Sequence, residues 1–134
     1  MTKKGGPLLH VLLAMAGLVL LYAALSYVLG TAHLLATVTS DSMKPALERG
    51  DWVLLEKKPA PLYRVNDTLV FALGQNQNVY VHRVVALTSD GGFRTKGDAN
   101  PYPDGWTVPK DAVLGKVVFR IPKLGYLALW LDGK

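Results

Sequence analysis

The chain has 134 residues and a formal net charge of +5, and it contains no cysteine. This length suffices for one modest domain beside an apolar segment, and the lack of thiols excludes disulfides and thiolate chemistry. The three histidines stand far apart, and the basic residues are scattered among acidic ones. We therefore predict no metal site, no cofactor and no nucleic-acid partner.

The N-terminal part of the chain is predicted to anchor it in a membrane. Lys3 and Lys4 precede a stretch that contains no charged residue until after Ser40. As a helix, residues 7–29 would be about 35 Å long, enough to cross a hydrocarbon core of about 30 Å. The positive-inside rule places the two lysines in the cytoplasm and the rest of the chain on the other side.

Three interpretations of this apolar stretch compete. A cleaved signal peptide would have a shorter apolar core and an A-x-A-like cleavage site, and a buried helix is seldom apolar on all sides. A permanent transmembrane helix fits the stretch best. The sequence thus predicts a cytoplasmic basic segment over residues 1–6, a transmembrane helix over 7–30 and an extracytoplasmic catalytic domain over 31–134, held at the plasma membrane by a single span.

The extracytoplasmic part is predicted to be mainly β. Short runs rich in β-branched residues alternate with turns that contain Gly, Pro and Asn, which is typical of a small antiparallel β domain. The apolar run at residues 124–131 is too short to span a bilayer, and it is interpreted as a core strand or an interfacial segment. The predicted strands cover residues 51–56, 67–73, 79–87, 93–96 and 113–121.

Candidate catalytic groups follow the apolar stretch. Ser40 and Ser42 stand two positions apart, so in an extended chain their side chains point to the same side. One hydroxyl could attack a carbonyl while the other donates a hydrogen bond to the developing charge. A serine needs a base to take its proton, and His82 in a predicted strand is a candidate. Asp98 and Asp104, in the following loop, could each orient this imidazole.

The ordered set of motifs resembles the type I signal peptidases, in particular their archaeal and endoplasmic-reticulum branch, in which histidine replaces the lysine base of most bacterial members. The motifs S-x-S-M-x-P, G-D, H-R-V-V, T-K-G-D-A-N-P-x-x-D, G-K-V-V and I-P-K-L-G-Y occur in this order over residues 36–126. The resemblance implies a membrane-bound serine endopeptidase that removes signal peptides from exported preproteins. It also implies preproteins, membrane lipid and secretion-machinery components as partners.

The resemblance further implies a role for each candidate residue. Ser42 matches the nucleophile, and Ser40 matches the serine that forms the oxyanion hole together with the Ser42 backbone amide. His82 matches the general base. Asp104 matches the carboxylate beside this histidine, and Asp98 is expected to support the loop or the histidine.

Other expectations and alternatives accompany this reading. The substrate is expected to bind as an added strand near residues 36–40 and 79–84. A Ser–Lys dyad that uses Lys96 or Lys44 is an alternative mechanism. A catalytically silent accessory module and a soluble self-cleaving repressor-type peptidase are alternative classes. The chain departs from the family at position 66, where it has Asn before Asp instead of the usual Gly.

Overall fold

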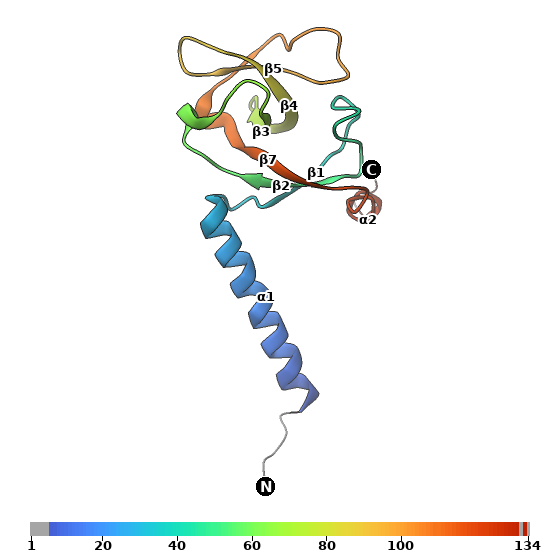
Figure 1. The fold of residues 1–134 in the computed structure, drawn as a ribbon. Helices are drawn as coiled ribbons and strands as arrows, with labels where there is room; N and C mark the ends of the chain where they lie inside the picture. Colours follow the sequence, from blue (N-terminus) through green and yellow to red (C-terminus); the bar gives the residue numbers. More distant parts are fainter. Residues whose placement is uncertain (1–5, 132, 134) are drawn as a thin grey trace.

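The computed structural model of the protein describes residues 6–131 and 133, and shows a long helix beneath a β domain (Figure 1). The helix α1 (Pro7–Leu29) covers the predicted apolar stretch, with proline in its first turn. It ends where Gly30 takes a left-handed backbone conformation, with φ at 65°. Its side chains are exposed or only partly buried, and its length and composition suit a membrane span. The two N-terminal lysines of the predicted orientation signal lie outside the described residues.

Seven strands form one antiparallel sheet, as the sequence predicts. Each of the five predicted strands is confirmed to within one residue at either end, and two short strands at the edges of the sheet were not predicted. In sheet order the strands are β1 (Leu35–Thr37), β2 (Trp52–Glu56), β7 (Val113–Ile121), β3 (Thr68–Leu73), β4 (Asn78–Leu87), β5 (Phe93–Lys96) and β6 (Thr107–Val108).

The sheet encloses two apolar clusters, and one of them anchors the serine segment. The first cluster surrounds Phe71 and Phe93. The second contains Met43 together with Val53 and Val70, and Met43 is fully buried. Burying a side chain of this size contributes about 2 kcal/mol. The residue directly after Ser42 is therefore fixed in the core, which leaves the serine at the surface of the domain.

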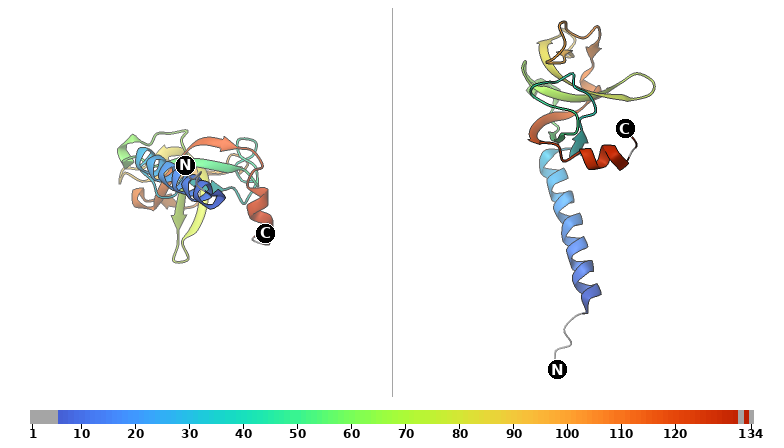
Figure 2. Two further views of the ribbon diagram at one scale, coloured as in Figure 1. Left: turned by 90° about the horizontal axis from the view of Figure 1, so that it is seen from below. Right: turned by 90° about the vertical axis from the view of Figure 1, so that its right-hand side faces the viewer.

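The C-terminal apolar run is a helix, so its interpretation as a core strand is wrong. The helix α2 (Tyr126–Leu131) follows a turn at Lys123, whose backbone φ is positive at 60°. This turn leads the chain out of the sheet. Leu129 is buried, whereas Leu127 and Trp130 are exposed. The helix lies at the base of the domain, on the side from which α1 leaves (Figures 1 and 2).

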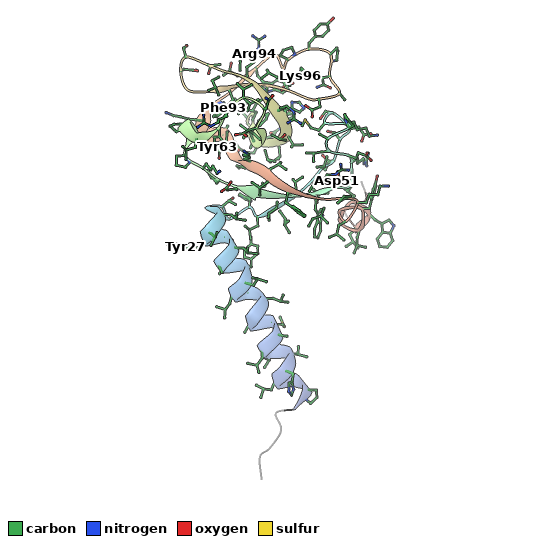
Figure 3. The ribbon with its side chains drawn as sticks, in the orientation of Figure 1. Tyr27, Asp51, Tyr63, Phe93, Arg94 and Lys96 are labelled. Carbon is green, nitrogen blue, oxygen red and sulfur yellow. The ribbon has the colours of Figure 1, made fainter. Side chains whose placement is uncertain are left out.

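Asp51, labelled in Figure 3, joins the end of the serine segment to the end of β7. Its buried carboxylate accepts hydrogen bonds from the amides of Glu48 (2.8 Å) and Lys123 (3.0 Å) and pairs with Arg120 (2.5 Å). Burial alone would raise the pKa of Asp51, but the two amides and the guanidinium outweigh it and lower this pKa below its ordinary value.

The lowered pKa of Asp51 predicts an acid-sensitive fold. A carboxylate of this kind contributes stability that is fully present above its ordinary pKa of 3.8 and is lost as the pH falls through the lower folded-state value. We expect Asp51→Asn to lower the free energy of unfolding by about 2 kcal/mol at neutral pH and to flatten its decline below pH 4. Thermal unfolding of the detergent-solubilised protein at several pH values measures both effects. The exposed Asp111→Asn is the matched control, and an unchanged pH dependence in Asp51→Asn would contradict the prediction.

Candidate active site

The serine segment turns sharply after β1. The chain bends at Ser40 and turns at Ser42, and the Leu47 amide donates to the Met43 carbonyl (3.0 Å). The expectation that the two serines lie in an extended segment is therefore wrong. The bend nevertheless brings their hydroxyl oxygens to 3.1 Å from each other, so they face the same space for a different reason.

His82 lies between a hydroxyl and a carboxylate. It is held in β4, which pairs with β3 through the register His82–Leu69, and its side chain is 8% exposed. Its Nε2 lies 3.2 Å from Ser42 Oγ, and its Nδ1 lies 2.6 Å from Asp104 Oδ2. With the proton on Nδ1, this nitrogen donates to the carboxylate, and the lone pair of Nε2 faces the serine hydroxyl. The structure thus brings Ser42, His82 and Asp104 into one hydrogen-bonded chain.

Thr95 is a member of this site that the sequence analysis missed. Its hydroxyl donates to Asp104 Oδ2 (2.7 Å), and its carbonyl accepts from the Asp104 amide (2.8 Å). Thr95 is fully buried in β5, two residues after the core residue Phe93 and on the same face of the strand. A hydroxyl at an inward-facing position needs a buried partner, and this pattern is the signal that could have identified it.

Asp98 does not reach the histidine. Its two carboxylate oxygens accept from Arg83 Nε (2.8 Å) and Nη2 (2.6 Å), and Arg83 Nη1 donates to the Asn66 carbonyl (3.0 Å). The hydrogen bonds to Asp98 raise the pKa of Arg83. Of the two predicted roles for Asp98, these contacts fit support of the loop and do not fit contact with His82.

The two candidate lysine bases are engaged elsewhere. Lys96 Nζ donates to the carbonyls of Gly97 (3.2 Å) and Asn100 (2.7 Å), and Lys44 Nζ pairs with Asp41 (3.2 Å). Within the described part of the chain, the Ser42 hydroxyl is hydrogen-bonded to the Ser40 hydroxyl and His82 alone. These contacts give no support to a Ser–Lys dyad. The described residues also contain no cluster of His, Asp and Glu that could hold a metal ion.

A groove runs up to the serine between two strand edges. It is lined by residues 36–40 and 79–82, with Val53 and Val70 between them. Among the described residues, β1 pairs with β2 alone, and the pairing of β4 with β5 begins only at Arg83. Each side of the groove therefore has one edge paired, β1 with β2 and residues 79–82 with β3, while the opposite edge faces the groove, and an extended peptide could bind between these two edges.

Comparison with known proteins decides the family. No family model matches the chain. It is 30% identical over 140 residues to the signal peptidase complex catalytic subunit SEC11 of Lachancea thermotolerans, covering 92% of this chain and 81% of that protein. The subunit of the same name from Colletotrichum graminicola is also 30% identical, with 97% and 82% covered, and that of Schizosaccharomyces pombe is 28% identical, with 92% and 80% covered. The chain belongs to the family of signal peptidase complex catalytic subunits. It is therefore a peptidase, and the resemblance seen in its motifs is confirmed.

The one departure from the signal peptidase motifs is explained by the backbone. Asn66 takes a positive φ of 77°, a conformation that glycine adopts freely and that asparagine tolerates better than most residues. Asparagine can therefore replace the glycine that signal peptidases usually have here without a change of the turn. The Asn66 carbonyl still receives its hydrogen bond from Arg83.

One loop of this signal peptidase contacts both ends of the hydrogen-bonded chain. The loop between β5 and β6 supplies Asp104 to the histidine, and its Ala99 amide donates to the Ser42 carbonyl (2.8 Å). Gly97 lies so close that an added Cβ would sit 2.7 Å from the Ser42 carbonyl oxygen. The absence of a side chain at Gly97 therefore lets the loop approach the serine.

We expect Gly97→Ala to lower peptidase activity about a hundredfold, because the new methyl group displaces the Ser42 backbone and misaligned catalytic groups cost about this much. The measurement is the initial rate of peptide cleavage together with the thermal unfolding midpoint. Gly105→Ala is the matched control, since an added Cβ there meets nothing within 4 Å. Equal activity in the two variants would show that the loop does not position the serine.

Proposed function

We propose that the protein is a membrane-bound serine endopeptidase that removes signal peptides from exported preproteins. The observation that carries the proposal is the hydrogen-bonded chain from Ser42 through His82 to Asp104, in a member of a signal peptidase family. Ser42 is the proposed nucleophile, His82 the general base and Asp104 the group that orients the histidine.

The chemistry follows from this geometry. As Ser42 Oγ forms a bond to the scissile carbonyl carbon, its proton passes to His82 Nε2. The resulting imidazolium is stabilised by Asp104, whose charge is held in place by the Thr95 hydroxyl. His82 then donates the proton to the leaving amine as the peptide bond breaks. In the second half of the reaction water attacks the acyl-enzyme, His82 takes the proton of this water, and the same proton returns to Ser42 Oγ as the acyl group leaves.

The oxyanion of the tetrahedral intermediate requires hydrogen-bond donors. The Ser40 hydroxyl lies 3.1 Å from the nucleophilic oxygen, close enough to donate to an oxyanion formed beside it. The Ser42 backbone amide is the second proposed donor. The Ala99 amide, bound to the Ser42 carbonyl, supports this assignment because it limits rotation of the peptide units around the serine.

The groove indicates how a substrate binds. A signal peptide in extended conformation is proposed to form backbone hydrogen bonds with the free edges of residues 36–40 and 79–82. Val53 and Val70 line the groove between those edges and leave shallow space for side chains. Small residues at positions −1 and −3 of the substrate would fit this space, as in an A-x-A-like cleavage site.

The membrane arrangement is part of the proposal. We infer that residues 7–30 cross the plasma membrane once, with residues 1–6 in the cytoplasm and residues 31–134 outside it. The exposed apolar surface of α1 on all sides supports this inference, because a helix of this kind needs a lipid environment. The active site then faces the compartment into which preproteins emerge.

Cleavage of a defined preprotein tests the proposed function. The detergent-solubilised protein is incubated with a preprotein that carries alanine at −1 and −3, and the new N-terminus is identified by mass spectrometry. We expect one cut after position −1, and the loss of this cut when phenylalanine replaces the alanine at −1. Cleavage at unrelated sites, or equal cleavage of both preproteins, would contradict the proposal.

A further inference from the structure

The two faces of β4 carry different side chains where the strand borders the groove. Val81 packs against the second apolar cluster, which also contains the groove residues Val53 and Val70. Its neighbour Tyr80 packs against the first cluster instead. Successive residues of a strand point to opposite faces, so the shallow space of the groove lies on the Val81 face of β4 and the Tyr80 ring lies on the other.

An aromatic row on the Tyr80 face extends from the core to the surface beside the catalytic histidine. Tyr80 stacks on the fully buried Phe71, with ring centroids 5.9 Å apart. Its ring centroid also lies 5.3 Å from that of Trp106 and 6.4 Å from that of His82. Trp106 is 41% exposed, so its indole is the outer end of the row and the part that a bound peptide can touch.

The chain on either side of Trp106 is fixed in place. Two residues earlier, Asp104 is hydrogen-bonded to His82 Nδ1 (2.6 Å). In the next position, Thr107 of β6 pairs with Arg94 of β5. The segment that orients the histidine therefore also holds the indole at a set position relative to the active site.

A substrate bound as proposed would present one side chain to this aromatic row. The groove runs from Ser42 and His82 back to Val79, so the substrate residues before the scissile bond lie along it. With positions −1 and −3 in the shallow space, position −2 of an extended peptide points to the opposite face. Tyr80 and Trp106 line that face directly before the histidine.

We propose that Tyr80 and Trp106 form a subsite for the side chain at position −2 of the substrate, and that this subsite selects aromatic and large apolar side chains. The inference deepens the proposed function and rests on it. Such a side chain would cover the exposed indole and pack against its ring, whereas alanine would leave the indole in water. Both residues are specificity-determining, because the reacting atoms are bound by Ser42 and His82 instead.

Rates of peptide cleavage test the subsite. Two peptides with alanine at −1 and −3 carry phenylalanine or alanine at −2, and kcat/KM is measured with the full-length protein in detergent. We expect wild type to prefer the phenylalanine peptide about fivefold, a ratio in the range that aromatic pairs provide. Trp106→Ala should lower this ratio to about one. Tyr102→Ala is the matched control, because Tyr102 is an aromatic residue of the same loop that is 77% exposed, and it should keep the wild-type ratio.

The outcomes separate the inference from the proposed function. Equal kcat/KM values for the two peptides in wild type would overturn the inference, and so would a ratio that Trp106→Ala leaves unchanged. If cleavage depends on the residue at −1 but not on that at −2, only the inference fails. If wild type does not cut after position −1, or is indifferent to the residue there, the proposed function fails and the inference falls with it.

A binding measurement gives a second readout that does not depend on turnover. Full-length Ser42→Ala is mixed with a peptide that carries p-bromophenylalanine at −2, since bromine quenches the fluorescence of an indole that it touches. We expect quenching relative to the unbrominated peptide. In the double variant Ser42→Ala, Trp106→Phe this quenching should disappear, while the anisotropy of a labelled peptide shows that binding persists. Undiminished quenching in the double variant would place position −2 beside Trp52 or Trp130 and contradict the inference.

Discussion

Ser42→Ala is expected to lower the turnover of a preprotein by about a millionfold, the loss seen when a serine peptidase is deprived of its nucleophile. The reason is chemical, since the alanine side chain has no oxygen to form the acyl-enzyme. The fold should persist, because the adjacent Met43 carries the core contact and Ser42 itself lies at the surface of the groove. The cleavage rate and the thermal unfolding midpoint are measured on the same preparation.

Two other serine substitutions make this result interpretable. Ser89→Ala, at an exposed turn, is the matched control and should retain full activity. Ser40→Ala should lose about a hundredfold in turnover, since removal of one oxyanion donor typically costs about 3 kcal/mol of barrier. Activity of Ser42→Ala comparable to that of Ser89→Ala would show that the nucleophile has been misassigned.

His82→Ala is expected to cause a loss of similar size, about a millionfold, because a serine without its base remains protonated. His82→Lys should restore little activity, since the neighbouring Asp104 carboxylate would hold a lysine in its charged form, which cannot accept a proton. Single-turnover cleavage of a peptide substrate measures these effects.

Substitution of Lys96 provides the decisive comparison. Lys96 bridges two carbonyls of the loop that carries Asp104, so Lys96→Met should retain most activity if the lysine only supports the loop. A histidine variant that remains active, together with an inactive lysine variant, would favour the Ser–Lys dyad and contradict the role proposed for His82.

The sequence predicts the strands and α1 well because both depend on local patterns. Alternation and β-branched composition identify β4, and an apolar stretch bounded by Pro7 and Gly30 identifies α1. The proximity of Ser42 and His82 could not come from such patterns, since 40 positions separate them in the chain. It was expected only because the ordered motifs resemble those of a known family.

The features that the sequence did not predict depend on the tertiary structure. Thr95 is one β-branched residue in a strand until the fold places its hydroxyl against Asp104. The partner of Asp98 depends on the pairing of β4 with β5, which brings Arg83 opposite Lys96, next to the loop. The C-terminal apolar run fits a strand or a helix by composition, and the positive φ of Lys123 decides the path of the chain.

Under the proposed membrane anchoring, the joint between α1 and the β domain limits which bonds the active site can reach. An added Cβ at Gly30 would lie 2.9 Å from the Lys57 carbonyl oxygen, so the helix is seated directly on the domain without a flexible tether. A peptidase on a long tether would reach bonds at many heights above the bilayer, whereas the direct joint would hold this active site at one height above the membrane that α1 is proposed to span. Under the proposed anchoring, we expect the distance of a cleavage site from the lipid to contribute to the choice of the bond, together with the side chains around that site.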